Sequence, residues 1–389
     1  MEDRGLLARN AMYVGGAIGP FGASIVVPML PELRNSFSAS SEQVAGSLTA
    51  YFIPFAVLLV VSGTIGERFG RRRVVRVSLV TYAISSLACA VAPGLGLFLA
   101  ARVAQGASNA FITPLLLAGL ADIHPPDRLG RAVGIYGSFQ AGGQVLAPVV
   151  GGLAAEVDWR LGFILPAALA LLLWFTPPPG EPRPGTDRPP VAALFHRRLL
   201  MLGLASLASG AGVIGIGYLV ALYSRDTLGV SPAGTGLLLM AGGGAGVVAS
   251  PFLGSLVDRL GGRRAGAIGA VAAGTVVVLL GQTRSVALVT LLWAGVGASA
   301  GLIRISQQRL AVGLVPRNRG GAVSSVLSLR FAGHAMSPIL WTSLLARDAR
   351  LDFLAVGLTA VLVVVLFGAM GPVGNLSEEQ SGEGFELTD

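Results

Sequence analysis

Long apolar runs separated by short polar loops make up most of this sequence. A helix that crosses the hydrocarbon core of a bilayer needs about 20 mainly apolar residues, and twelve runs come close to that length or exceed it. The expected spans are residues 11–31, 44–65, 74–92, 95–121, 132–154, 161–176, 199–223, 233–256, 265–282, 286–312, 321–345 and 353–371. The pattern predicts an all-α membrane protein with twelve transmembrane helices.

Two of the loops between these runs repeat each other. GTIGERFGRRR (Gly63 to Arg73) and GSLVDRLGGRR (Gly254 to Arg264) share a glycine, an acid–arginine pair, a second glycine and a cluster of arginines. They lie 191 residues apart, and PPDRLGRA (125–132) aligns with VPRNRGGA (315–322) at an offset of 190. The repeat predicts two pseudo-symmetric six-helix bundles. A duplicated membrane bundle of this kind is typical of transporters.

Composition shifts mark the boundaries of these two bundles. The segment PPPGEPRPGTDRPP (Pro177 to Pro190) is too rich in proline to continue a helix. The residues after Pro372 are acidic and contain no basic side chain. We therefore expect an N-terminal bundle at 1–176, a cytoplasmic linker at 177–198, a C-terminal bundle at 199–371 and an acidic cytoplasmic tail at 372–389.

The charge of the chain indicates orientation in a membrane. Only 12% of the residues are charged, whereas a soluble domain has about 25%. The net charge is +8, and all 28 basic residues are arginine, because the sequence contains no lysine. Loops on one side of the expected spans hold roughly three times as many arginines as loops on the other, which predicts both termini in the cytoplasm. We expect a multi-pass protein of the cell membrane with the lipid bilayer as its partner, and no nucleic acid.

Enzymes and primary pumps need residues that this sequence does not supply. A membrane-embedded enzyme requires clustered histidines and acids, and the chain has three histidines, none near a second candidate ligand within a span. A phosphate-binding loop of the Gly-x-x-x-x-Gly-Lys type requires lysine. We therefore expect no enzymatic activity, no cofactor and no metal. The energy for any transport would then come from an ion gradient or from another protein.

Three motifs resemble those of a known transporter family. GTIGERFGRRR resembles the loop between helices 2 and 3 of the major facilitator superfamily, with Glu67 where aspartate is usual. ARVAQGASNA resembles the Arg-x-x-Gln-Gly motif of helix 4 at Arg102, Gln105 and Gly106. GGQVLAPVVGG resembles the helix 5 antiporter motif Gly-x-x-x-Gly-Pro-x-x-Gly-Gly, with Ala147 replacing the second glycine. The chain most resembles the twelve-helix drug:proton antiporter branch, which implies the major facilitator fold.

The resemblance also implies roles for the motif residues. The family's loop latches the cytoplasmic side shut, which implies a conformational latch at Gly63, Glu67, Arg68, Gly70, Arg71, Asp258 and Arg259. The helix 5 motif, matched at Gly143, Pro148, Gly151 and Gly152, is linked to export rather than uptake. Arg102 would serve substrate binding or proton coupling. Each motif also has a purely structural alternative: charge that sets orientation, generic helix packing, or an arginine hydrogen-bonded to backbone carbonyls.

Polar residues within or at the ends of the spans predict the substrate and proton path, because polar groups in a bilayer turn towards protein or water. They are Arg102, Gln105, Asn109, Asp122, Gln140, Gln144, Arg304, Gln307, Arg330 and His334. At the repeat offset of 190, Arg330 aligns with Gln140 and His334 with Gln144. We expect these four side chains to meet across the pseudo-twofold axis, where such folds bind substrate.

The charges of these residues bear on the substrate. No aspartate or glutamate lies in the middle of a span, so the basic side chains Arg102, Arg304, Arg330 and His334 would repel cations and accept neutral or anionic solutes. Arginine stays protonated, which leaves His334 or Asp122 to carry a coupling proton. A histidine hydrogen-bonded in a helix interface is the alternative.

The sequence therefore favours proton-coupled export of a small neutral or anionic amphiphile by a monomer that works by alternating access. A facilitator or importer of a small metabolite, such as a sugar or organic acid, and a membrane sensor that does not transport remain alternatives.

Overall fold

The computed structural model describes residues 2–176, 196–315 and 319–371, and the described part of the chain contains helices and no strands. The first half holds α1 (Glu2–Gly15), α2 (Ile18–Ser24), η1 (Val27–Met29), α3 (Leu30–Ser36), α4 (Ser41–Phe69), α5 (Arg71–Ala90), α6 (Leu95–Ile123), α7 (Pro126–Val157) and α8 (Leu161–Trp174). The second half holds α9 (Arg197–Ala211), α10 (Gly217–Leu222), η3 (Tyr223–Thr227), α11 (Pro232–Leu260), α12 (Gly262–Leu280), α13 (Val286–Leu314), α14 (Arg319–Arg347) and α15 (Ala349–Ala369).

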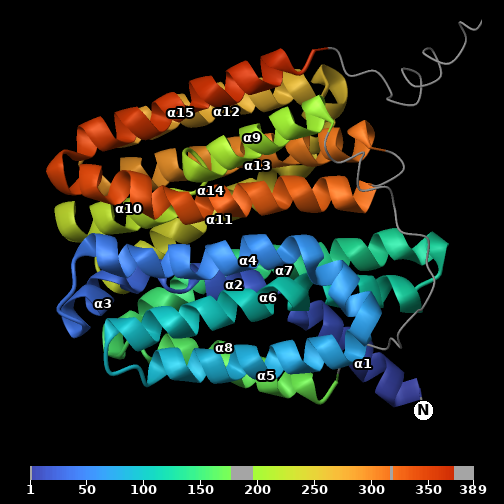
Figure 1. Ribbon diagram of the computed structural model, residues 1–389. Helices are drawn as coiled ribbons and strands as arrows, with labels where there is room; N and C mark the ends of the chain where they lie inside the picture. Colours follow the sequence, from blue (N-terminus) through green and yellow to red (C-terminus); the bar gives the residue numbers. More distant parts are fainter. Residues whose placement is uncertain (1, 177–195, 316–318, 372–389) are drawn as a thin grey trace, which may run out of the picture.

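These helices form two bundles that lie side by side with their long axes nearly parallel (Figure 1). Eight helical segments are long and apolar enough to cross a membrane, and the other four expected spans correspond to α7, α8, α9–α10 and α14. This confirms the prediction of an all-α membrane protein, and the described helices are consistent with the expected twelve spans. Residues 177–195 and 372–389, most of the expected linker and the whole tail, lie outside the described residues. The helix α9 already begins at Arg197, inside the expected linker.

The first span of each half is broken rather than continuous. Residues 9–36 divide into α1, α2, η1 and α3, with Pro28 and Pro31 at the starts of the last two elements. In the second half, α9 ends before Gly212, and α10 and η3 follow. A broken helix leaves backbone carbonyls without intrahelical donors, so side chains can bind them.

The repeated segments at 63–73 and 254–264 are mostly helical, which corrects their interpretation as loops. Gly63 and Gly254 lie inside α4 and α11, and the arginine clusters lie at the starts of α5 and α12. One glycine forms each joint: Gly70 with φ 83° and Gly261 with φ 78°. Glycine adopts positive φ without a steric penalty, so it allows one helix to follow another after a single residue.

Two helix pairs form the main contacts between the halves, α4 with α14 and α7 with α11. Along α4, Thr49 Oγ1 donates to the carbonyl oxygen of Ala335 at 2.7 Å, and Ser328 Oγ donates to that of Ala56 at 2.6 Å. Along α7, a Cβ atom added to Gly236 would lie 2.3 Å from the carbonyl oxygen of Pro148. We call each of these two contacts between the halves a seam. The α7–α11 seam therefore depends on close contact between backbones.

The two ends of the bundles differ in their contacts. We call the end with residues 37–40, 158–160 and 228–231 the paired end, and the end with Gly70, residues 124–125 and Gly261 the termini end. The paired end lies at the left of Figure 1, near α3 and α10, and the N-terminus lies at the right.

Candidate functional site

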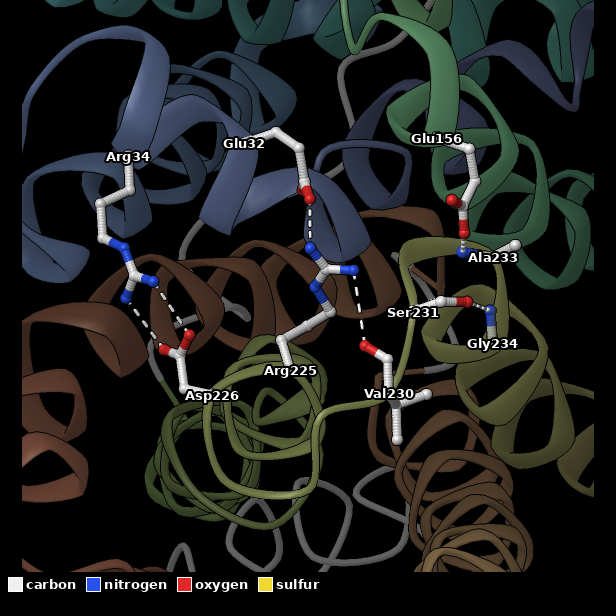
Figure 2. Close-up of polar contacts among 9 residues, drawn as sticks. All are labelled: Glu32, Arg34, Glu156, Arg225, Asp226, Val230, Ser231, Ala233 and Gly234. Carbon is white, nitrogen blue, oxygen red and sulfur yellow. Dashed lines mark hydrogen bonds and ion pairs between the residues drawn. The ribbon is translucent and has the colours of Figure 1, made fainter.

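Ion pairs between the two halves join the paired end (Figure 2). Arg34 of α3 donates two hydrogen bonds of 2.9 Å to the carboxylate of Asp226 in η3. Glu32, also in α3, accepts a hydrogen bond from Arg225. Each half thus contributes one acid and one arginine, and opposite charges face each other in both pairs. A bidentate arginine–carboxylate contact fixes geometry as well as charge.

A third contact at this end belongs to the α7–α11 seam. The carboxylate of Glu156, in the last turn of α7, accepts a hydrogen bond of 3.0 Å from the backbone nitrogen of Ala233. Ser231 caps the same helix by accepting from Gly234 at 3.1 Å. Free backbone N–H groups and the helix dipole make the start of α11 attractive to an anion. Glu156 therefore holds the end of one half against the start of a helix in the other.

Ion pairs at the termini end remain within one half wherever the structure describes them. Arg71 pairs with Asp122, joining α5 to α6, and Arg309 pairs with Asp258, joining α13 to α11. Open space surrounds Gly63, because an added Cβ atom would meet no other atom within 4 Å. The expected latch residues Glu67, Arg68 and Arg259 are exposed, and Gly70 forms the turn between α4 and α5. None of the described latch side chains forms an ion pair with the other half in this conformation.

The helix 5 motif lies between two neighbouring segments. A Cβ atom added to Gly143 would lie 2.6 Å from the carbonyl oxygen of Ala17, and one added to Gly151 would lie 2.2 Å from that of Ile25. One added to Gly152 would lie 2.3 Å from the carbonyl oxygen of Pro232. The glycines of α7 therefore allow close approach to the broken first span on one side and to α11 on the other.

Arg102 is enclosed in the first half. Its side chain is 0% exposed and lies over the ring of Tyr51, 4.4 Å from the centroid. It donates to the carbonyl oxygen of Gly22 at 2.9 Å, to that of Ser47 at 3.4 Å, and to Gln105. Gln105 in turn donates to Ser86 at 2.7 Å. This conformation corresponds to the structural alternative, an arginine that binds backbone carbonyls.

Three other candidate path residues also have partners within their own half. Asn109 is 3% exposed and accepts from Thr113 at 3.3 Å. Gln307 is buried and donates to Ser209 at 3.2 Å. Asp122 lies at the termini end in its ion pair with Arg71. None of these side chains contacts Arg330 or His334 through a described hydrogen bond.

Gln140 and Gln144 lie on α7. Gln144 is exposed although it lies in mid-span, and Gln140 is half-buried. Pro148 follows Gln144 by one helical turn on the same face and contacts Gly236 of α11. Gln144 therefore lies one turn from a close contact of the α7–α11 seam, on the side of that contact towards the termini end.

The structure brings Arg304, Arg330 and His334 together in the second half. The ring centroid of His334 lies 5.4 Å from that of Phe52 and 5.7 Å from that of Phe331. Arg330 lies one turn before His334 on α14, with its guanidinium 5.2 Å from the Phe331 centroid. Arg304 lies on α13, which contacts α14. Three of the four predicted basic groups thus form one cluster, and Arg102 lies apart from it.

The four side chains expected to meet across the pseudo-twofold axis lie on two helices, α7 and α14, that belong to different seams. Gln140 and Gln144 lie on α7, which packs against α11, whereas Arg330 and His334 lie on α14, which packs against α4. No hydrogen bond joins one pair to the other within the described ranges. The pseudo-symmetry is preserved in that each pair lies on a helix that contacts the opposite half.

Two groups of functional candidates are absent from the sequence-based set. One is the aromatic cluster of Phe52, Phe55 and Phe331, in which the Phe55 and Phe331 centroids are 4.8 Å apart across the halves. The other is the set of paired-end charges. Its sequence signal was present, because charged residues of both signs follow the first expected span of each half at 32–34 and 225–226.

Comparison with known proteins agrees with this architecture. The sequence model of the Major Facilitator Superfamily matches residues 12–338 and 202–383. The uncharacterized MFS-type transporter EfpA of Mycobacterium tuberculosis is 31% identical over 164 residues, which cover 41% of this chain and 31% of EfpA. The multidrug resistance protein B homolog of the same species is 32% identical over 213 residues, covering 53% of this chain and 37% of that protein. The chain thus matches about a third of the length of these curated relatives.

Solved structures share the fold across nearly the whole chain. A bacterial homolog of the human lysosomal transporter Spinster, in an inward-facing and unoccupied conformation, superposes with a TM-score of 0.78 at 17% sequence identity. The match covers 95% of this chain and 97% of that one. At this identity the likeness establishes the fold.

Proposed function

Because the chain belongs to the major facilitator superfamily, we propose that it is a proton-coupled secondary transporter that exports a small neutral or anionic amphiphile by alternating access. The observation that carries the proposal is the asymmetry of its ends: ion pairs between halves join the paired end, while the described latch residues at the termini end remain apart. In such a mechanism the two bundles rock around a site at mid-depth, so each end closes while the other opens.

The arginine distribution supports an orientation in the cell membrane. Arginine-rich segments lie at the termini end, including the starts of α5 and α12, and the positive-inside rule assigns such segments to the cytoplasm. Both termini would then be cytoplasmic and the paired end external. The conformation described here would be the one that faces inward and accepts substrate from the cell.

The latch residues would act in the opposite conformation. When the paired end opens, the termini ends of the bundles would approach, and the open surface around Gly63 would receive a helix from the other half. Arg71 and Asp258 have partners within their own halves that could be exchanged as the bundles move. The glycines at 63 and 254 would permit that approach, just as Gly152 and Gly236 permit close contact in the α7–α11 seam.

The basic cluster supports a neutral or anionic substrate. Arg304, Arg330 and His334 would repel an organic cation, and no described acid pairs with either arginine. The relative named multidrug resistance protein B homolog supports efflux as the direction. Both halves of the path belong to one chain, so we propose a monomer as the working unit.

Proton coupling would use His334 or Asp122. His334 packs on Phe52 of the opposite half, so its surroundings must change when the α4–α14 seam opens. Asp122 pairs with Arg71, which belongs to the proposed latch, so its partner would change when the termini end closes. Either group would therefore sense the conformational cycle.

Flux in proteoliposomes tests this proposal. Purified protein is reconstituted, a pH gradient is imposed, and the flux of neutral, anionic and cationic compounds is recorded together with internal pH. Flux of a neutral or anionic compound with matching proton movement is the expected result. Flux that ignores the gradient would indicate a facilitator, and the absence of flux for every compound would indicate a sensor.

A further inference from the structure

The arginines of the transmembrane region are of two kinds. Arg102 is fully buried, and its donors bind two backbone carbonyls and Gln105. Arg304 and Arg330 are also in mid-span, yet across the described residues neither donates a hydrogen bond to a side chain or carbonyl, and neither has an ion-pair partner. The first arrangement is that of a structural arginine. The second leaves two positive charges without counter-charge in a region where such charges are costly.

The guanidinium groups of Arg304 and Arg330 remain accessible. One nitrogen of Arg102 is buried without a partner, whereas no nitrogen of Arg304 or Arg330 is both buried and unpartnered. Both arginines are half-buried, and they lie on α13 and α14, two helices that contact each other. Their mutual repulsion would be relieved by an anion bound within reach of both.

Apolar rings lie directly beside this charge. The Arg330 guanidinium is 5.2 Å from the Phe331 centroid, and the Phe331 ring stacks on that of Phe52 with centroids 5.7 Å apart. His334 stacks on the same Phe52 ring at 5.4 Å. Phe55 completes the cluster from the opposite half. A ligand held by the arginines would therefore meet aromatic rings of both halves.

We propose that Arg304 and Arg330 bind the carboxylate of an aromatic carboxylic acid whose ring lies against Phe52 and Phe331. The planar fork of a guanidinium matches a carboxylate through two parallel hydrogen bonds, which a neutral amide cannot reproduce. Rings from both halves would contact the ligand, so its binding is coupled to the α4–α14 seam. This inference rests on the proposed transport function, because it assigns the substrate class to that same site.

Calorimetric titration of the full chain in detergent solution tests the proposal without any gradient. The probe is 2-naphthoate, compared with its neutral isostere 2-naphthamide and with the cation 2-naphthylmethylammonium. We expect naphthoate to bind at least tenfold more tightly than the amide and the cation not to bind. Equal binding of naphthoate and naphthamide would overturn the carboxylate assignment.

Matched variants locate the site. Arg304→Gln and Arg330→Gln should each weaken naphthoate binding at least tenfold, whereas Arg284→Gln, at an exposed arginine of the paired end, should leave it unchanged. Arg330→Lys, which keeps the charge without the fork, should lie between the parent protein and Arg330→Gln. Thermal melts of each variant identify any that fail to fold. Undiminished binding in folded Arg304→Gln and Arg330→Gln would overturn the proposal.

A further variant tests the aromatic surface. Phe331→Leu should reduce the preference for naphthoate over the aliphatic cyclohexanecarboxylate, and an unchanged preference would count against the ring contact.

The outcomes also separate this inference from the proposed function. Proton-linked flux of another compound without naphthoate binding overturns only the site, whereas arginine-dependent binding without any proton-linked flux overturns only the transport mechanism.

Discussion

Arg34 and Asp226 lie 192 positions apart in the sequence and are joined by two hydrogen bonds of 2.9 Å across the halves. Together with Glu32 and Arg225, they hold the paired end closed. If the bundles rock during transport, these contacts must break in each cycle. Their strength then sets part of the balance between the two conformations.

Removal of one ion pair should shift that balance modestly. Asp226→Asn removes the charge but not the shape, and an exposed ion pair contributes roughly 0.2–1 kcal/mol, so the open population of the paired end should rise about 1.4- to fivefold. Alkylation of a cysteine introduced at Thr49 reports that opening. The exchanged pair Arg34→Asp with Asp226→Arg should return the labelling rate towards that of the parent. Labelling that is unchanged in Asp226→Asn would exclude the pair as a determinant.

The α7–α11 seam should not tolerate a side chain at Gly152. Gly152→Ala would place Cβ 2.3 Å from the carbonyl oxygen of Pro232, and such overpacking costs about 1–3 kcal/mol. The thermal melting temperature in detergent should fall. Gly137→Ala lies on the same helix with open space around the added methyl group, so it should be neutral or slightly stabilising. Equal melting temperatures for the two variants would show that the seam relaxes without cost.

Substitution of Arg102 separates its two assigned roles. Arg102→Met leaves the carbonyl oxygen of Gly22 and the amide oxygen of Gln105 without their donor, and each unsatisfied buried group costs about 1–3 kcal/mol. We expect a marked loss of thermal stability and of folded yield. A variant that melts like the parent but no longer couples flux to pH would instead support the coupling role that the family resemblance implies.

Proton coupling should depend on His334 or Asp122. Flux and internal pH are recorded together for His334→Gln and Asp122→Asn, with His124→Gln as the matched control outside the mid-span region. His124 contacts Tyr13 at the termini end and should leave coupling unchanged. We expect one of the first two variants to lose pH-driven flux. Retention of full coupling in both would show that neither group carries the proton.

The sequence predicted the fold well because lipid imposes simple rules on it. Span length, the position of proline and glycine, and the offset of 190–191 residues between repeats are all visible in the residues themselves. The repeated segments at 63–73 and 254–264 were interpreted as loops because clusters of arginine are typical of the loops between membrane spans. A single glycine at 70 or 261 allows the flanking helices to begin and end within those clusters.

The candidate site was only partly predictable, because residues of one type can face different surroundings. Arg102 and Arg330 are both mid-span arginines, and no local pattern separates them. Both guanidinium groups lie near an aromatic ring, but Arg102 also lies opposite the broken helix around α2, where the carbonyl oxygen of Gly22 accepts its hydrogen bond, and Arg330 has no such acceptor among the described residues. The difference comes from tertiary packing between helices. The same holds for the pairing of Glu32 with Arg225, which requires knowing which end of the bundles is closed.

The central claim is that the two halves rock so that one end opens as the other closes. Electron–electron distance measurements on spin labels test it most directly, with one pair at Glu42 and Arg347 of the paired end and another at Arg68 and Arg259 of the termini end. All four positions are exposed, and Cys89, the only native cysteine, is buried. Upon imposing a pH gradient with substrate, we predict that the paired-end distance lengthens while the termini-end distance shortens. Distances that remain fixed, or that change in the same direction, would contradict alternating access by this chain.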